Sequence, residues 1–232
     1  MIERPHFITD EIYHIFNRGV EKRTIFMNQG DYFRFIHDLF EFNDKAPAFD
    51  VRHHVSKESE LPHKRRKPRD LLVEILCFCA MPNHYHLLLR QKIEGGITEF
   101  MRKFGTGYTN YFNKKYERVG HLLQGKFKAV HVAKESHLLY LPHYIHLNPL
   151  DLIMPEWRDQ KVKDPNEAIR FLASYRWSSY MDYIGLPNFP SVTQRNFLHE
   201  MYGSPTSRDY LEMMKNWIED IKFEFLQGVT LE

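Results

Sequence analysis

The chain has 232 residues, of which 43% are hydrophobic and 27% charged, and its formal net charge is only +2. A chain of this length and composition buries a core without disulfides, which excludes a disordered chain or a disulfide scaffold. No apolar run approaches 18 residues, so we expect no membrane span. The first six residues contain no apolar h-region, so we expect no signal peptide. Cys77 and Cys79 lie two apart on one predicted strand and are poorly placed to pair, which favours a reduced, cytoplasmic protein.

The first part of the chain predicts a strand over residues 12–20 and a helix over residues 31–42, where aromatic and aliphatic residues recur every three or four positions. Residues 46–70 are polar, basic and contain prolines, and we interpret them as a long loop or insertion. The basic run Lys64, Arg65, Arg66 and Lys67 is a candidate phosphate-contacting arm, although a solvated loop can have the same composition.

The next elements are a pair of apolar strands joined at Pro82-Asn83, then a helix, a strand that alternates in polarity, and a helix that ends before Pro149. Their expected bounds are 71–81, 84–91, 97–116, 124–133 and 136–148. The first six elements of the chain give the order βαββαβ, which is typical of an α+β, ferredoxin-like core with an antiparallel sheet and helices on one face. We therefore divide the chain into a core domain, 1–150, and a mostly helical extension, 151–230, which ends in an amphipathic acidic helix over 207–226.

The charges are distributed unevenly along the chain. Residues 101–134 contain eight Lys or Arg and one acid, Glu117, whereas acidic residues outnumber basic ones from His199 onward. A basic middle segment favours contact with a polyanion, although a solvated helix face would carry the same charges. The acidic helix could pack over the sheet, bind a partner protein or form a homodimer, and these alternatives stay open.

His84 and His86 form the most informative pair of side chains. Alternate residues of a strand point to the same side, so the two imidazoles should project together from one face of the sheet. Paired neutral imidazoles at this spacing are half of a metal site, although a chain with 14 histidines can also place two on one strand by chance.

Tyr144 and Asn148 lie four residues apart and should share one face of the last core helix. If that helix packs beside the hairpin, an amide oxygen and two imidazoles could hold a divalent metal with open positions, and the phenol could serve as a nucleophile. Tyr108, Tyr111 and Tyr140 are competitors for this role, and Asn148 before a proline could simply end the helix. His143 and His146 should lie on other helix faces, at the surface or against phosphates.

The segment Met81-Pro82-Asn83-His84-Tyr85-His86-Leu87-Leu88 resembles the HUH motif, in which two histidines flank a bulky residue. The segment Tyr144-Ile145-His146-Leu147-Asn148-Pro149 resembles the nucleophile helix of single-tyrosine transposases, in particular the REP-associated tyrosine transposases. Further likenesses to that family begin at Tyr13, Gln124 and Tyr175. Two departures are the tyrosine at the middle HUH position and Pro142, which could kink the nucleophile helix.

The resemblance implies an enzyme that cuts and rejoins single-stranded DNA at hairpin-forming repeats, through a 5′-phosphotyrosine intermediate. It implies that Tyr144 is the nucleophile and that His84, His86 and Asn148 bind Mg²⁺ or Mn²⁺. Candidate DNA contacts are Arg18, Gln124, Lys126 and Lys128, together with the basic arm at 64–67.

Two other classes of function remain. A histidine-triad nucleotide hydrolase needs a third histidine at position 88, where this chain has leucine. A non-catalytic or domesticated nucleic-acid-binding module on the same fold is compatible with the aromatic content of 15%.

Overall fold

The structure is a computed structural model that describes residues 4–46, 69–159, 161–203 and 206–219. Its centre is a four-stranded antiparallel sheet in the order β2-β3-β1-β4. The core elements are β1 (Ile12–Arg18), α1 (Gln29–Glu41), β2 (Val73–Met81), β3 (His84–Gln91), α2 (Gly96–Lys115) and β4 (Lys128–His131). This order and topology confirm the α+β, ferredoxin-like prediction.

The elements that follow β4 are helical throughout the described residues. They are α3 (Glu135–Leu147), η3 (Asn148–Leu152), η4 (Pro155–Asp159), α4 (Pro165–Ser174), α5 (Tyr180–Tyr183), α6 (Asn196–Met201) and α7 (Ser207–Glu219). The predicted continuation of the last helix to residue 226 and the basic arm at 64–67 lie outside the described residues.

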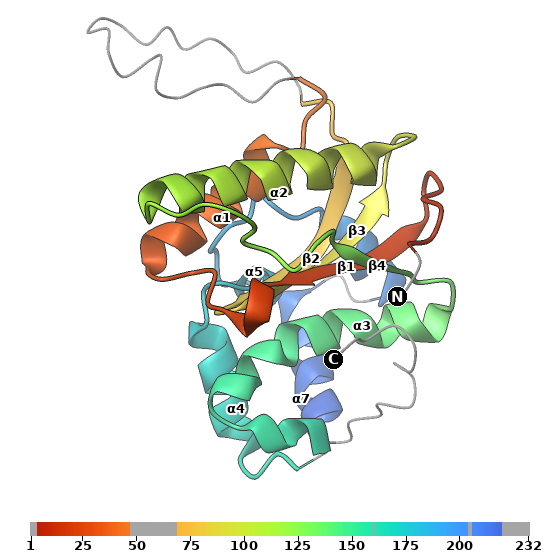
Figure 1. Cartoon of the computed structure of the whole chain (residues 1–232). Coiled ribbons are helices and arrows are strands. Elements are labelled where there is room, and N and C mark those ends of the chain that lie inside the picture. Colours follow the sequence, from red (N-terminus) through yellow and green to blue (C-terminus); the bar gives the residue numbers. More distant parts are fainter. Residues whose placement is uncertain (1–3, 47–68, 160, 204–205, 220–232) are drawn as a thin grey trace, which may run out of the picture.

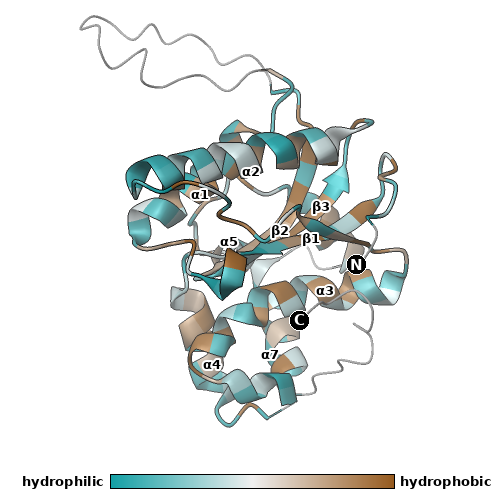
Figure 2. Ribbon diagram, in the orientation of Figure 1, coloured by the Kyte–Doolittle hydropathy of each residue, from teal (hydrophilic) through white to brown (hydrophobic). Residues whose placement is uncertain are grey.

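Helices cover both faces of the sheet (Figure 1). The core helices α1 and α2 pack on one face over residues such as Ile15 and Leu87, as the predicted fold requires. The opposite face packs against α3 and the C-terminal helices, with Leu88, Leu147 and Trp217 in one continuous apolar cluster. In Figure 2 the strands carry hydrophobic segments, while α1 and α2 include many hydrophilic residues. The division of the chain near residue 150 stays a prediction, and the two parts share this second core.

Two local features explain where elements begin and end. Helix α1 begins with a capping box, in which Asp31 accepts hydrogen bonds from the backbone nitrogens of Met27 (2.8 Å) and Asn28 (3.3 Å). The last strand is shorter than the predicted 124–133. Gly125 adopts a left-handed φ of 67° and its nitrogen bonds to the carbonyl of Leu123, so the chain turns there before β4 begins.

Cys77 and Cys79 are buried in β2 and neither forms a disulfide, as expected. Burial raises the pKa of both thiols. No helix in the described ranges is long and apolar enough to cross a membrane.

Candidate active site

The two histidines of the hairpin point to the face of the sheet that α3 covers. His84 is partly exposed and His86 is buried, and their ring centroids lie 5.1 Å apart with the planes nearly perpendicular. Tyr85 points to the other face and packs against Phe35 and Phe104. The tyrosine at the middle position of the HUH segment therefore lies away from the two imidazoles, as expected from the strand period.

A third histidine, His14, supports this pair from the neighbouring strand β1. Its ring stacks on that of His86 at 5.1 Å, and its Nε2 lies 2.9 Å from Nδ1 of His86. On the other side, Nδ1 of His84 lies 2.6 Å from the amide oxygen of Asn83. Both hairpin histidines therefore use Nδ1 within the protein, which orients Nε2 for another partner. His14 lies in a segment that carried the family likeness, but its role depends on β1 pairing with β3, which spacing alone does not reveal.

Both hairpin imidazoles are neutral at pH 7. Burial, followed by the positive charge of Arg18, lowers the pKa of His84 to about 4. Burial and the neighbouring His84 and His14 lower the pKa of His86 well below its usual value. A neutral imidazole has the lone pair that metal ligation requires.

Helix α3 brings Tyr144 and Asn148 against the same histidines. The Tyr144 ring is buried and meets the His86 ring edge-on at 6.0 Å. The Asn148 side chain donates from Nδ2 to the carbonyl oxygen of Tyr144 at 2.8 Å, and it lies near enough to His84 to act on the pKa of that imidazole, in the raising direction. The helix runs through Pro142 without interruption, so the proline does not remove Tyr144 from the hairpin. The four residues proposed from the sequence therefore lie together.

The competing tyrosines lie elsewhere. Tyr108 and Tyr111 belong to α2 on the opposite face of the sheet, where their hydroxyls bond to Ile25 and Asp31. Tyr140 lies one turn before Tyr144 on α3, and its ring is next to that of Trp217. Of these four tyrosines, Tyr144 is the one that contacts the hairpin histidines.

Sequence analysis missed an arginine beside the tyrosine. The guanidinium of Arg158 donates to the Tyr144 hydroxyl and to Oδ1 of Asn148, at 3.3 Å in each case. The Asp151 carboxylate accepts two hydrogen bonds from the same guanidinium, at 2.8 and 2.7 Å. Trp157 lies beneath it, with 4.7 Å from the guanidinium carbon to the ring centroid. Arg158 is in η4, ten residues beyond Asn148, and no sequence motif indicates it.

The candidate DNA contacts differ in how close they lie to this centre. Arg18 pairs with His84 across strands β1 and β3, and Lys128 pairs with Phe16 on the same face, 5.9 Å from its ring. Gln124 and Lys126 are exposed in the turn before β4. Arg18 and Lys128 therefore flank the histidines, while Gln124 and Lys126 extend the surface beyond them.

The prediction that His143 and His146 lie at the surface or against phosphates is wrong. His146 is fully buried between the hydroxyls of Tyr210 (2.7 Å) and Ser179 (2.8 Å). His143 is also buried, stacks on Tyr210 and Trp217, and bonds through Nδ1 to the carbonyl of Leu139. The C-terminal helices cover this side of α3, which the helix period alone could not show.

A divalent metal is compatible with the donor atoms present. Two neutral imidazoles and the Asn148 amide oxygen provide three neutral ligands and leave coordination positions for other oxygens. Within the described ranges, no group of three or more His, Cys, Asp or Glu side chains is placed to hold a metal ion. Asn148 would therefore have to complete the set.

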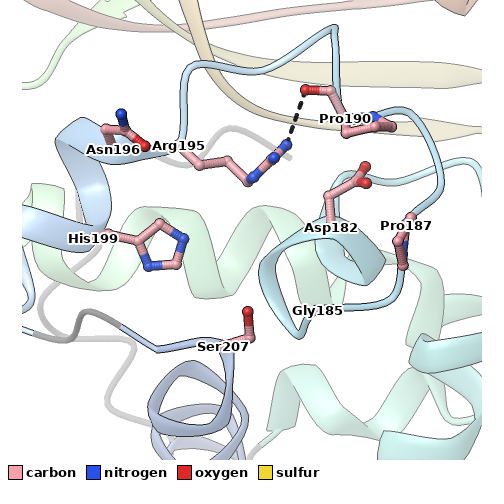
Figure 3. Close-up of a pocket in the computed structure, with 8 residues that line it drawn as sticks. All are labelled: Asp182, Gly185, Pro187, Pro190, Arg195, Asn196, His199 and Ser207. Atoms are coloured by element: carbon pink, nitrogen blue, oxygen red, sulfur yellow. Dashed lines mark hydrogen bonds between the residues drawn. The ribbon is translucent and has the colours of Figure 1, made fainter.

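A separate pocket lies between the C-terminal elements and contains none of these residues (Figure 3). Its charged groups are engaged in holding a loop: Asp182 accepts from the nitrogens of Asn188 and Phe189, and Arg195 donates to Pro190 and Thr193. We therefore assign the pocket a structural role. Its lining residues are Asp182, Gly185, Pro187, Pro190, Arg195, Asn196, His199 and Ser207.

Comparison with known proteins shows what the chain is similar to. Residues 56–148 match the family model described as "Transposase IS200 like". The match includes the hairpin histidines and ends at Asn148, and it confirms the resemblance to single-tyrosine transposases. A solved structure of a REP-associated tyrosine transposase bound to a REP hairpin aligns with 82% of this transposase-like chain and 89% of its own, at 14% identity and a TM-score of 0.46. No curated protein sequence matches the chain.

Proposed function

We propose that this transposase-like chain is a metal-dependent single-stranded DNA endonuclease and strand transferase that acts on hairpin-forming repeat DNA. The observation that carries the proposal is the convergence of Tyr144 and Asn148 with His84 and His86. A buried phenol beside two neutral imidazoles and an amide oxygen combines a nucleophile with ligands for an electrophilic ion. The IS200-like match over 56–148 supports the same reaction.

In the proposed reaction, the hydroxyl of Tyr144 loses its proton to solvent and its oxygen attacks the scissile phosphorus. The bond from phosphorus to O3′ breaks, O3′ takes a proton from solvent, and the 5′ phosphate stays on the tyrosine. Attack by another 3′-hydroxyl reverses these steps and rejoins the strand. His84, His86 and Asn148 would hold Mg²⁺ or Mn²⁺, which supplies charge to polarise the phosphate.

Positive charge beside the histidines supports contact with a DNA strand. Arg18 and Lys128 lie on the face that carries His84, and Lys126 and Gln124 are exposed nearby. Contacts from such side chains to phosphates position a strand without reading its bases. The arm Lys64, Arg65, Arg66 and Lys67 remains part of this proposal on the basis of its charge alone.

The test is incubation of the protein with labelled single-stranded hairpins and Mn²⁺, followed by denaturing electrophoresis. We expect a covalent protein–DNA band that Tyr144→Phe abolishes while hairpin binding persists. Tyr140→Phe, one turn earlier on the same helix, is the matched control and should keep the band. A band that survives Tyr144→Phe would place the nucleophile elsewhere.

The metal requirement is tested in the same assay. His84→Ala and addition of EDTA should each abolish the band, because the phosphate would lose its electrophilic partner. Cleavage that EDTA leaves unchanged would refute the metal role. A wild-type protein that binds the hairpin but never forms the band with any divalent metal would instead be a non-catalytic binding module.

A further inference from the structure

Arg158 is a charged group in contact with the atom that would react. Its terminal nitrogens reach the Tyr144 hydroxyl and Oδ1 of Asn148, each at 3.3 Å. The tyrosine is 1% exposed and the asparagine is fully buried, whereas the Arg158 side chain is 23% exposed. Of these three side chains, Arg158 is therefore the one that solvent reaches most.

The guanidinium is held rigidly by groups that have no other place in the proposed reaction. Asp151 accepts from Nε and from one terminal nitrogen, and it is itself fixed by a 2.7 Å bond from the indole nitrogen of Trp157. The Trp157 ring is fully buried and supports the guanidinium from below. Because the guanidinium is already held in place, Arg158 does not have to move when negative charge develops beside it. Hydrogen-bond donors that are fixed in this way before the reaction stabilise a developing charge most effectively.

We propose that Arg158 is a second catalytic residue, which stabilises the developing phenolate of Tyr144 and the negative charge that develops on the scissile phosphate in the transition state. This inference rests on the proposed function. Arg158 exchanges no proton in it: the tyrosine proton passes to solvent, and the guanidinium stays protonated and donates to the phenolate oxygen and then to a phosphate oxygen. Asp151 and Trp157 are positioning residues, because they act through Arg158.

The experiment measures single-turnover adduct formation on a hairpin oligonucleotide with Mn²⁺ across a range of pH. Loss of one preorganised donor to a developing charge lowers rates by about 100- to 1,000-fold. We expect Arg158→Gln to lower the rate at neutral pH by about 100-fold, to move the pH at which the rate rises upward, and to leave the hairpin Kd within about threefold. Arg170→Gln on α4 removes the same charge from an exposed side chain and is the matched control.

Two further variants keep the test decisive. Arg158→Lys keeps the charge but not the fork that engages Asp151 and the phenol together, so we expect a rate about tenfold lower than wild type and a smaller shift of the pH profile. Asp151→Asn should affect the rate in the same direction without changing DNA affinity.

The outcomes separate the inference from the function on which it rests. Rates within threefold of wild type in Arg158→Lys and Arg158→Gln, while Tyr144→Phe is inactive, would overturn the role of Arg158 and leave the proposed function intact. An unshifted pH profile with weaker DNA binding would also overturn it, because it would reduce Arg158 to a surface cation. Adducts in Tyr144→Phe would overturn the proposed function itself.

Discussion

The buried histidine His143 should make the stability of the fold sensitive to mild acid. Burial lowers the pKa of its imidazole to about 4, because α3 and the C-terminal helix α7 enclose it. Among the residues that the structure describes, its Nε2 has no hydrogen-bond partner. The same side chain in the unfolded chain has a pKa of about 6.5. Between pH 6.5 and about 4 the imidazole is protonated in the unfolded state and neutral in the folded state, so lowering the pH through this range favours unfolding.

The size of this effect follows from the two pKa values. Between pH 7 and pH 5 the unfolded imidazole becomes almost fully charged while the folded one stays neutral, which removes about 2 kcal/mol of unfolding free energy. His143→Phe removes the titrating group and retains an aromatic ring to stack on Tyr210 and Trp217. Between pH 7 and pH 5, the unfolding free energy of His143→Phe should therefore fall by about 2 kcal/mol less than that of the wild type.

Urea denaturation at pH 7, 6 and 5, followed by circular dichroism, measures the difference. His121→Gln, at an exposed position, is the control and should retain the wild-type pH dependence. Parallel pH dependences for wild type and His143→Phe would show that the imidazole is not held neutral between α3 and α7.

Three other predictions concern the rest of the molecule. His14→Phe, introduced into the Tyr144→Phe variant, should weaken Mn²⁺ binding measured by calorimetry by about 10- to 100-fold, because His86 loses the partner of its Nδ1. Unchanged Mn²⁺ affinity would refute a supporting role for His14. Gly105→Ala should stabilise α2 by about 0.5–1 kcal/mol, since its Cβ would meet open space, whereas Gly107→Ala should destabilise it because its Cβ would clash with the Phe42 ring. Thermal melts that move in the same direction for the two variants would contradict this. Asp31→Asn should cost about 3 kcal/mol in urea denaturation, because the buried carboxylate accepts from Lys115, Tyr111 and Tyr116, and a cost below about 1 kcal/mol would show that these bonds are replaced by water.

The hairpin and its histidines could be predicted from the sequence because strand period and turn chemistry act locally. The shared direction of His84 and His86, and the opposite direction of Tyr85, follow from alternation along a single strand. The predicted length of β4 was wrong because alternation continues through residues that the turn at Gly125 removes from the sheet. Alternation every two residues shows to which side of a sheet a side chain points, but it does not show where a strand stops pairing with the neighbouring strand.

The remaining parts of the site depend on contacts between distant segments. Spacing placed Tyr144 and Asn148 on one face of α3, but it could not show that α7 would cover His143 and His146. Arg158 reaches Tyr144 only because η3 and η4 turn the chain back over the end of α3. The sequence around position 158 contains no motif or periodicity from which the contact between Arg158 and Tyr144 could be inferred.

The way the C-terminal segment meets β2 limits how this chain can associate with a second copy. The backbone nitrogen of Ala80 donates to the carbonyl of Trp177, that of Ser179 to the carbonyl of Phe78, and that of Gln194 to the carbonyl of Ile75. Strand β2 is one margin of the sheet, and these bonds occupy the outward backbone groups that another strand would need. Within the described residues, the other margin is the four-residue β4, so a dimer that extended the sheet across two chains would have to join them there, and one formed in any other way would rely on side-chain surfaces.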